Sequence, residues 1–258
     1  MINYLVILLL LTLIIYLILN KNRTFEFFSD EPMFDIYAIS LGNPDRIKNI
    51  EEQQKRLNIK IKVFDAVVGD KLDINELIKQ KLLIEPNSFN DNVTKKKRQL
   101  GCYLSHYRIY EKIKKDSKNG YTIVFEDDFQ ISKENLIETI EQTITELNKK
   151  QMDFDILYLG NLQNNHGINV LENLYEINSS EDLFGTHAYI IKNKHIDKII
   201  NATKSFDCPI DNRLQDLGKS KSLIIYVYYP TLVNQGGSES TITENFRETF
   251  SNNFSIFD

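Results

Sequence analysis

The sequence predicts an α/β domain around a mostly parallel sheet, preceded by one N-terminal transmembrane helix. Apolar, β-branched runs alternate with amphipathic helical segments along the chain, which is the pattern of a sheet covered by helices. One of these runs, residues 121–129, ends in three adjacent carboxylates. The third observation is that the first residues of the chain are almost wholly apolar.

Residues 1–19 are predicted to form an uncleaved membrane anchor. Residues 5–19 are apolar except for Thr12 and Tyr16. Counted from Ile2, about 18 residues at ~1.5 Å each span roughly 27 Å, which is just enough for the bilayer core. No basic residue precedes the run and no small-residue cleavage site follows it, which disfavours a signal peptide. A buried core helix is the alternative.

Membrane contact is therefore expected through residues 2–19, whereas the side of the membrane stays open. Lys21 and Arg23 favour a cytosolic domain by the positive-inside rule. Five N-x-[ST] sequons would instead fit a lumenal domain. Residues 20–33 are expected to be a stalk, and residues 34–258 the folded domain.

The bulk properties narrow the class of protein. The length of 258 residues fits one α/β domain, and 42% hydrophobic residues suffice for a sizeable core. A net charge of −5 with no dominant basic patch argues against nucleic acid as the main partner. The short basic run 95–98 fits a solvated loop or helix start, or a contact with phosphate or an anionic membrane. Cys102 and Cys208 could form one bridge, but two cysteines make no disulfide framework.

Two strand and helix units open the folded domain. Residues 35–41 form an apolar strand, and Asn43 followed by Pro44 suits the N-cap and first position of a helix. Residues 60–68 are expected to be a second strand. Residues 73–83 carry apolar side chains at helical spacing and predict a short helix.

The middle of the domain places the acidic strand between two helices. The polar, proline-containing segment 85–99 predicts a loop. Residues 100–115 return to a helical period, and residues 136–147 form a clear amphipathic helix.

The last part of the domain is less regular. Strands are expected over residues 154–159, 186–191 and 224–229, helices over residues 194–203 and 212–217, and irregular structure over residues 162–182.

The acidic end of the central strand comprises Glu126, Asp127 and Asp128. In open α/β sheets, ligands bind beyond the carboxyl ends of the strands. Three like charges there raise one another's pKa unless a cation lies among them. Mg²⁺ and Mn²⁺ favour carboxylate oxygens and are often shared with substrate phosphates. The triplet therefore predicts a site for a metal and a diphosphate, and an acidic cap on the next helix is the alternative.

Several separated segments resemble glycosyltransferase family 25, which includes lipooligosaccharide galactosyltransferases and the glycosyltransferases of collagen hydroxylysine. The two most specific are Gly-Cys-x-x-Ser-His at residues 101–106 and Glu-Asp-Asp at residues 126–128, in the family's order and spacing. The other similar segments are residues 35–41 with Asp45-Arg46, 63–69, 185–191, 208–211 and 230–242. Ser40 departs from the Asn that is more usual in the family, and the family's Arg-rich turn is reduced to Arg46.

The resemblance implies an inverting glycosyltransferase of the GT-A type that uses Mn²⁺, or Mg²⁺, and a UDP-sugar as donor. The transferred hexose would be galactose or glucose, and the acceptor a hydroxyl group of a glycan or a protein. The acidic triplet agrees with this chemistry. The leaving diphosphate gains negative charge in the transition state, and a divalent cation stabilises that charge as a Lewis acid.

Glu126 and Asp128 are the predicted metal ligands, and Asp127 is predicted to support the donor. Alternate residues of an extended segment point the same way, so Glu126 and Asp128 should share a face while Asp127 turns aside. The further donor-binding residues that the family's motifs imply are Ser40, Arg46, Asp65, Ser105 and His106. Several have structural alternatives: His106 can be a packing histidine, Arg46 merely solvated and Asp65 only the end of its strand.

An inverting displacement needs a base that takes the acceptor proton. The metal carboxylates are unsuitable because the cation uses their lone pairs. Asp211 is the predicted catalytic base, since it lies on a turn and matches the acidic position of the family's Pro-x-Asp segment. Its alternative role is the N-cap of the helix at residues 212–217. His187 is the rival base, or else a core residue or a wall of the active site.

Two other functions compete with this one. The first is an inactive relative that binds sugar nucleotides or glycans, against which the intact acidic triplet argues. The second is a metal-dependent phosphohydrolase. The long segments 85–99 and 162–182, which could cover a sugar acceptor, argue against it.

Overall fold

The computed structural model describes residues 33–162, 167–178 and 183–236. By its contacts the chain divides into two units, residues 1–33 and 34–258. The predicted anchor, residues 1–19, and nearly all of the predicted stalk lie outside the described residues. Within the described part, no helix is both long enough and apolar enough to cross a membrane.

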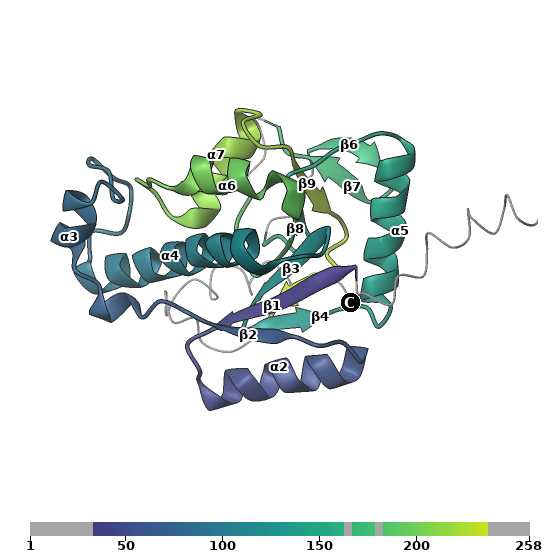
Figure 1. Ribbon diagram of the computed structural model, residues 1–258, viewed down its shortest axis with the longest axis horizontal. Coiled ribbons are helices and arrows are strands. Elements are labelled where there is room, and N and C mark those ends of the chain that lie inside the picture. Colours follow the sequence, from purple (N-terminus) through teal and green to yellow (C-terminus); the bar gives the residue numbers. More distant parts are fainter. Residues whose placement is uncertain (1–32, 163–166, 179–182, 237–258) are drawn as a thin grey trace, which may run out of the picture. The chain divides into compact units, whose positions relative to one another are not determined.

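Eight strands of the described chain form one mixed, mainly parallel sheet (Figure 1). β7 and β8 run against the other six strands. The predicted α/β class is confirmed, and these two strands make its sheet mixed. In spatial order the strands are β2 (Lys62–Asp65), β1 (Phe34–Ser40), β3 (Tyr121–Glu126), β8 (Ala188–Lys192), β5 (Ile156–Tyr158), β9 (Ile225–Tyr228), β7 (Leu174–Glu176) and β6 (Ile168–Leu171).

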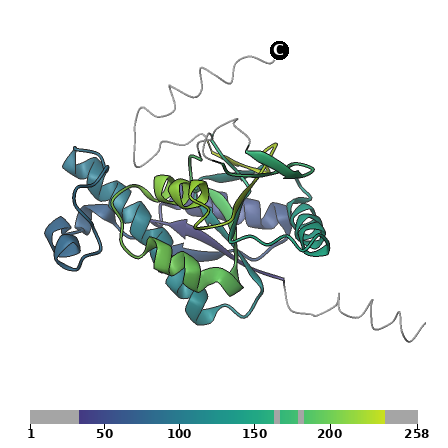
Figure 2. The same ribbon diagram turned by 90° about the horizontal axis from the view of Figure 1, so that it is seen from above.

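Helices cover both faces of this sheet. α4 (Val93–Asp116), α6 (Ile196–Thr203) and α7 (Ile210–Lys219) share one core with the sheet, and Figure 2 shows the green α6 and α7 beside the teal α4. α2 (Pro44–Leu57) and α5 (Leu136–Lys149) share the other core. Successive strand residues alternate between the two cores: Val124 belongs to the α4 side and Ile123 to the α5 side.

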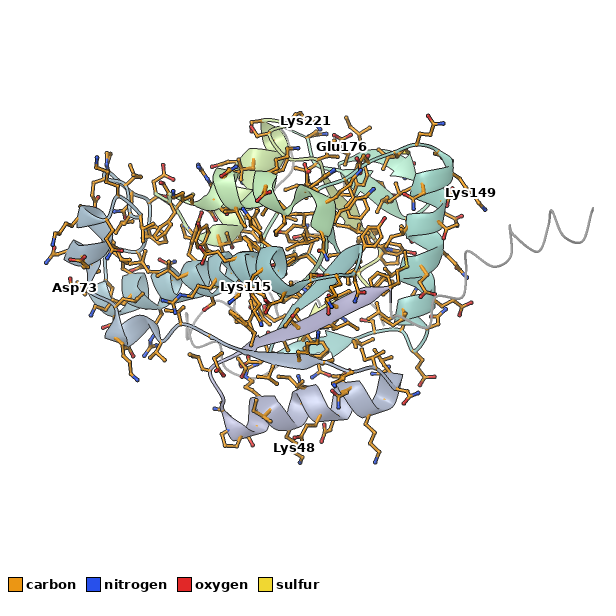
Figure 3. The ribbon with its side chains drawn as sticks, in the orientation of Figure 1. Lys48, Asp73, Lys115, Lys149, Glu176 and Lys221 are labelled. Atoms are coloured by element: carbon orange, nitrogen blue, oxygen red, sulfur yellow. The ribbon has the colours of Figure 1, made fainter. Side chains whose placement is uncertain are left out.

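β3 is an interior strand, because it pairs with β1 on one side and β8 on the other. Tyr121 to Phe125 are all buried, as expected for an apolar run with no polar alternation. Lysines such as Lys48 and Lys221 are exposed on the outside. Lys48 on α2 points away from the sheet, and Lys221 pairs with Glu176 at 2.7 Å (Figure 3).

The predicted loop at residues 85–99 is wrong in its second half. α4 already begins at Val93, because the Asn92 side chain caps it by accepting a hydrogen bond from the Lys95 amide at 3.1 Å. The basic run 95–98 therefore lies in the first turns of a helix. The first turns of α4 extend beyond the core and are polar, so the sequence shows no helical period of apolar residues there. The remaining short helices are η1 (Gly69–Lys71), α3 (Ile74–Lys79) and η2 (Asn193–His195).

The predicted irregular segment 162–182 contains a hairpin, formed by β6 and β7. Its turn includes Asn173 at a positive φ of 61°, a conformation that Asn tolerates well. β4 (Phe129–Ile131) follows the acidic triplet and pairs antiparallel with β10 (Val233–Gln235). This second ladder brings a distant part of the chain beside the triplet.

Candidate active site

The candidate site lies where the C-terminal ends of β1 and β3 meet the N-terminal end of β8. β1 and β3 are parallel, with Ile39 opposite Glu126. β8 is antiparallel to β3, so Thr186 and His187, which precede it, reach the same edge. The Glu126 amide donates to the His187 carbonyl at 2.9 Å, which fixes this junction. The sheet topology thus gathers residues that are distant in sequence.

The acidic triplet divides between two sets of partners. Asp127 and Asp128 both face Arg46 on α2: Arg46 Nε lies 3.8 Å from Asp127 Oδ1, and Nη1 lies 3.3 Å from Asp128 Oδ2. The Ser40 hydroxyl donates to Asp127 Oδ2 at 2.6 Å. The prediction that Asp127 turns aside from Asp128 is wrong. β3 ends at Glu126 and the next two residues form a turn, so the alternation of a strand does not continue.

Glu126 is held from the other side. The Thr186 hydroxyl donates to Glu126 Oε1 at 2.6 Å, and His106 Nε2 lies 3.2 Å from the same oxygen. Burial by itself raises the pKa of Glu126, but its contacts with His106 and Thr186 outweigh that effect and lower it. Glu126 is therefore held as a carboxylate.

Asp128 is in a less favourable position for a charge. Burial, and then the charge of Glu126, raise the pKa of Asp128 to about 6, although Arg46 and the Gln235 amide at 3.0 Å oppose this. Its Oδ1 atom is buried and has no hydrogen-bond partner among the described residues. A buried carboxylate oxygen without a donor is suited to a hard divalent cation. The residues present therefore fit Mn²⁺ or Mg²⁺.

His106 is fully buried on α4 and links this helix to the end of β3. Its Nδ1 lies 2.7 Å from the Tyr189 hydroxyl, which is 3.3 Å from the Tyr110 hydroxyl. Both ring nitrogens of His106 thus have partners inside the protein. The histidine acts on the site through Glu126.

Ser105 and Gly101 attach the segment after β2 to α4. The Ser105 hydroxyl accepts from the Val67 amide at 2.8 Å and donates to the Gly101 carbonyl at 2.6 Å. A Cβ atom on Gly101 would lie 2.8 Å from the Gly69 Cα, so no larger residue fits there. Both hydrogen bonds of Ser105 go to the backbone, so its observed role is to position this segment. Asp65 ends β2 opposite Ser40 and is exposed at the same edge of the sheet.

The two predicted bases lie on the side of Glu126. Asp211 is in the first turn of α7, whose N-cap is Pro209, so the alternative N-cap role of Asp211 is wrong. Burial raises the pKa of Asp211, and the charge of Glu126 adds to the rise. His187 is buried, which lowers its pKa, and its Nε2 lies 3.1 Å from the Val233 carbonyl. Its Nδ1 has no hydrogen-bond partner among the described residues.

Three residues of the site were not predicted. Thr186 contacts Glu126, Gln235 contacts Asp128, and the Asn49 amide donates to the Asp127 carbonyl at 3.0 Å. Thr186 and Gln235 lie in segments that resemble the family, and this resemblance could have indicated that they belong to the site. Asn49 follows Arg46 by three residues on α2, and this helical spacing was the only hint of its place.

The sequence and the fold were compared with those of known proteins. The family model "Glycosyltransferase family 25 (LPS biosynthesis protein)" matches residues 33–214, which is most of the chain. The chain belongs to glycosyltransferase family 25. A Bos taurus relative named "Probable inactive glycosyltransferase 25 family member 3" is 29% identical over 161 residues, covering 61% of this chain and 27% of its own length.

A second relative is the Xenopus laevis procollagen galactosyltransferase 1-A, 26% identical over 182 residues, or 67% of this chain and 29% of its own. The family 25 chain thus spans less than a third of the length of these curated relatives. Among solved structures, apo UDP-glucose pyrophosphorylase aligns with a TM-score of 0.39 and 11% identity, over 76% of this chain and 90% of that one. A Drosophila galactosyltransferase 7 mutant in complex with manganese, UDP-Gal and xylobiose aligns with a TM-score of 0.35 and 11% identity. The alignment covers 83% of this chain and 73% of that one. Likenesses this distant do not bear on the fold or the activity.

Proposed function

We propose that this family 25 protein is an inverting glycosyltransferase of the GT-A type. It transfers a hexose, galactose or glucose, from a UDP-sugar to a hydroxyl group of a glycan or a protein. The observation that carries the proposal is the acidic triplet at the carboxyl ends of β1 and β3, where ligands bind in open α/β sheets. There Asp128 keeps a buried oxygen without a partner among the described residues.

Asp128 and Glu126 would hold the divalent cation, Mn²⁺ or Mg²⁺, through oxygen ligands. When bound, the cation would neutralise charge on the leaving diphosphate. Asp127 is held by Ser40 and Arg46 and supports the donor from the same side as Asp128. Asp65 lies at the same edge, where it can accept a hydrogen bond from the nucleoside.

Arg46 has a specific part in donor binding. Its guanidinium is paired with Asp127 and Asp128, where it supplies the positive charge that two adjacent carboxylates need. A guanidinium at this place would also bind phosphate oxygens of the donor, in the fork geometry that Arg favours. Arg46 would therefore contact both the acidic turn and the diphosphate of the donor.

Asp211 is the proposed base. Its pKa is raised by burial, which makes its carboxylate more basic than an exposed one, and a base works best with a pKa nearer to neutrality. It accepts the proton of the acceptor hydroxyl as that oxygen attacks the anomeric carbon. His187 is the rival, since its lowered pKa keeps it neutral and its Nδ1 would be free to accept a proton when Nε2 donates to the Val233 carbonyl.

A non-catalytic alternative is favoured by one observation, the relatives that are named inactive. Such a protein would bind the donor without turning it over. Residues 2–19 are further proposed as a single-span anchor that keeps the domain at a membrane, because they are long and apolar enough to cross it.

The test is a panel of nucleotide sugars assayed for UDP release with Mn²⁺ and with a chelator. Mn²⁺-dependent release with UDP-galactose or UDP-glucose, lost in Asp128→Asn and kept in Asp91→Asn, is the expected result. Asp91 is a suitable control because it is an exposed carboxylate near the start of α4. Donor binding without release for every sugar would support the inactive alternative. Release of inorganic phosphate instead of UDP would indicate a phosphohydrolase.

A further inference from the structure

We infer that Cys102, His106 and Glu126 form a binding site for a soft divalent cation of the Zn²⁺ class. The site lies beside the oxygen-ligand site of Asp128 and shares Glu126 with it. Nothing in the proposed transfer reaction needs a thiol, so this cluster requires its own explanation.

The three ligand atoms already lie close together. The Cys102 Sγ, a ring nitrogen of His106 and a carboxylate oxygen of Glu126 are all within 4.8 Å of one another. A tetrahedral zinc ion, bonded at about 2.0 Å to nitrogen and about 2.3 Å to sulfur, holds its ligands roughly 3.5 Å apart. The nitrogen and the carboxylate oxygen are 3.2 Å apart, so only the thiol has to move, by roughly 1.3 Å at most.

The secondary structure fixes this arrangement. Cys102 and His106 are four residues apart on α4 and therefore face the same way on adjacent turns. Glu126 ends β3, the strand against which this face of α4 packs. Two rigid elements thus supply the ligands, which favours a preformed site over one assembled by a loop.

The ligands are also oriented by their own hydrogen bonds. Tyr189 lies 2.7 Å from His106 Nδ1, which leaves Nε2 directed at Glu126. Histidines that bind metals commonly use their second ring nitrogen in this way, and the bond selects the tautomer. Thr186 similarly holds the Glu126 carboxylate at 2.6 Å.

The charge around Cys102 is negative. The charges of Glu126, Asp211 and Asp128 act on its thiol. Arg46 pairs with Asp127 and Asp128. A divalent cation would offset this charge. On binding, the thiol releases its proton to solvent and the thiolate sulfur bonds the metal.

The ligand chemistry selects the kind of cation. Thiolate and imidazole favour Zn²⁺, whereas Mn²⁺ and Mg²⁺ prefer oxygen ligands. Three protein ligands leave a fourth position for water. Tyr158, whose ring lies 5.9 Å from that of Tyr189, has a buried hydroxyl without a hydrogen-bond partner among the described residues. This part of the interior therefore still has a polar group that a bound water can satisfy.

The test uses Co²⁺ as a spectroscopic substitute for Zn²⁺ in the full chain. Titration should give a thiolate-to-cobalt charge-transfer band that corresponds to one thiolate-bound Co²⁺ per chain, because Co²⁺ at the oxygen-ligand site gives no such band, and Zn²⁺ should abolish it. The chain has two cysteines, so Cys208→Ser is the matched control. The band should be lost in Cys102→Ser and kept in Cys208→Ser, with circular dichroism showing that both variants are folded.

A variant that removes no ligand tests the orientation argument. Tyr189→Phe deletes only the hydroxyl and should weaken Zn²⁺ binding by about 10- to 100-fold, the usual cost of losing such a partner. Absence of the band in the wild-type chain, or its persistence in Cys102→Ser, would overturn the inference. Because the binding assay does not use transfer activity, it stands apart from the proposed function. If that function holds, Zn²⁺ should inhibit Mn²⁺-dependent transfer less in Cys102→Ser than in Cys208→Ser.

Discussion

Replacing Asp128 by Asn should stabilise the cation-free protein while abolishing transfer. The side chain is buried and only 7% exposed, and burial followed by the charge of Glu126 raises its pKa from 3.8 to about 6. Asn removes the charge but keeps an oxygen that can accept from Gln235. The structure therefore predicts opposite effects on stability and on activity.

The size of the stability gain in Asp128→Asn, and the pH range over which it develops, follow from proton linkage. A raised pKa means that the folded state holds its proton more tightly than the unfolded chain, so stability falls as the pH rises from about 4 to about 6. Two pKa units correspond to about 3 kcal/mol, the expected upper limit of the gain in Asp128→Asn at pH 8. At pH 4.5 the same relation gives a gain of only about 1 kcal/mol.

The assay is urea denaturation with a chelator present, at pH 4.5 and pH 8, comparing wild type, Asp128→Asn and the control Asp91→Asn. We predict that Asp128→Asn raises the free energy of unfolding at pH 8, that this rise is smaller at pH 4.5, and that the control shows no rise. An equal gain at both pH values, or a loss of stability at pH 8, would refute the view that burial of an ionised Asp128 destabilises the fold.

Three further predictions follow from the structure. Asp211→Asn should bind donor normally but transfer at least ~100-fold more slowly, which is the usual size of a general-base contribution. Normal transfer in this variant would instead assign the base to His187, and His187→Ala tests that assignment. A chain that starts at Phe34 should stay in solution and keep activity, whereas the full chain should remain with membranes in alkaline carbonate, and its release would rule out the anchor. Gly101→Ala places a Cβ 2.8 Å from backbone atoms and should cost about 1–3 kcal/mol of unfolding free energy. Gly120→Ala meets nothing within 4 Å, so an equal loss there would show that the close packing at Gly101 is unimportant.

Much of the fold could be predicted because its signals are local. The apolar run before Glu126 indicated a buried strand, and the Asn43–Pro44 pair indicated the start of α2 at the right position. The parallel ends of β1 and β3 bring Ser40 to Asp127, and the family's motifs had implied a donor-binding role for each of these two residues. These inferences needed only the period of the chain and the direction of adjacent strands.

The rest depends on contacts that local sequence does not encode. The turn after Glu126 directs Asp128 toward Arg46, and no period of the chain gives that direction. Gln235 reaches Asp128 only because β10 pairs with β4, about a hundred residues away in the sequence. The start of α4 was hidden because its first turns are polar on all sides, although Asn92 offered an N-cap signal.

The central claim is that the acidic end of β3 binds a nucleoside diphosphate together with a divalent cation. Calorimetric titration of UDP into the full chain, with Mn²⁺ or with a chelator, tests it most directly, and Asp128→Asn and Asp91→Asn serve as the variant and its control. We predict binding of UDP that requires both Mn²⁺ and Asp128 and is unchanged in Asp91→Asn. Equal UDP binding with the chelator, or in Asp128→Asn, would contradict the assignment of this site.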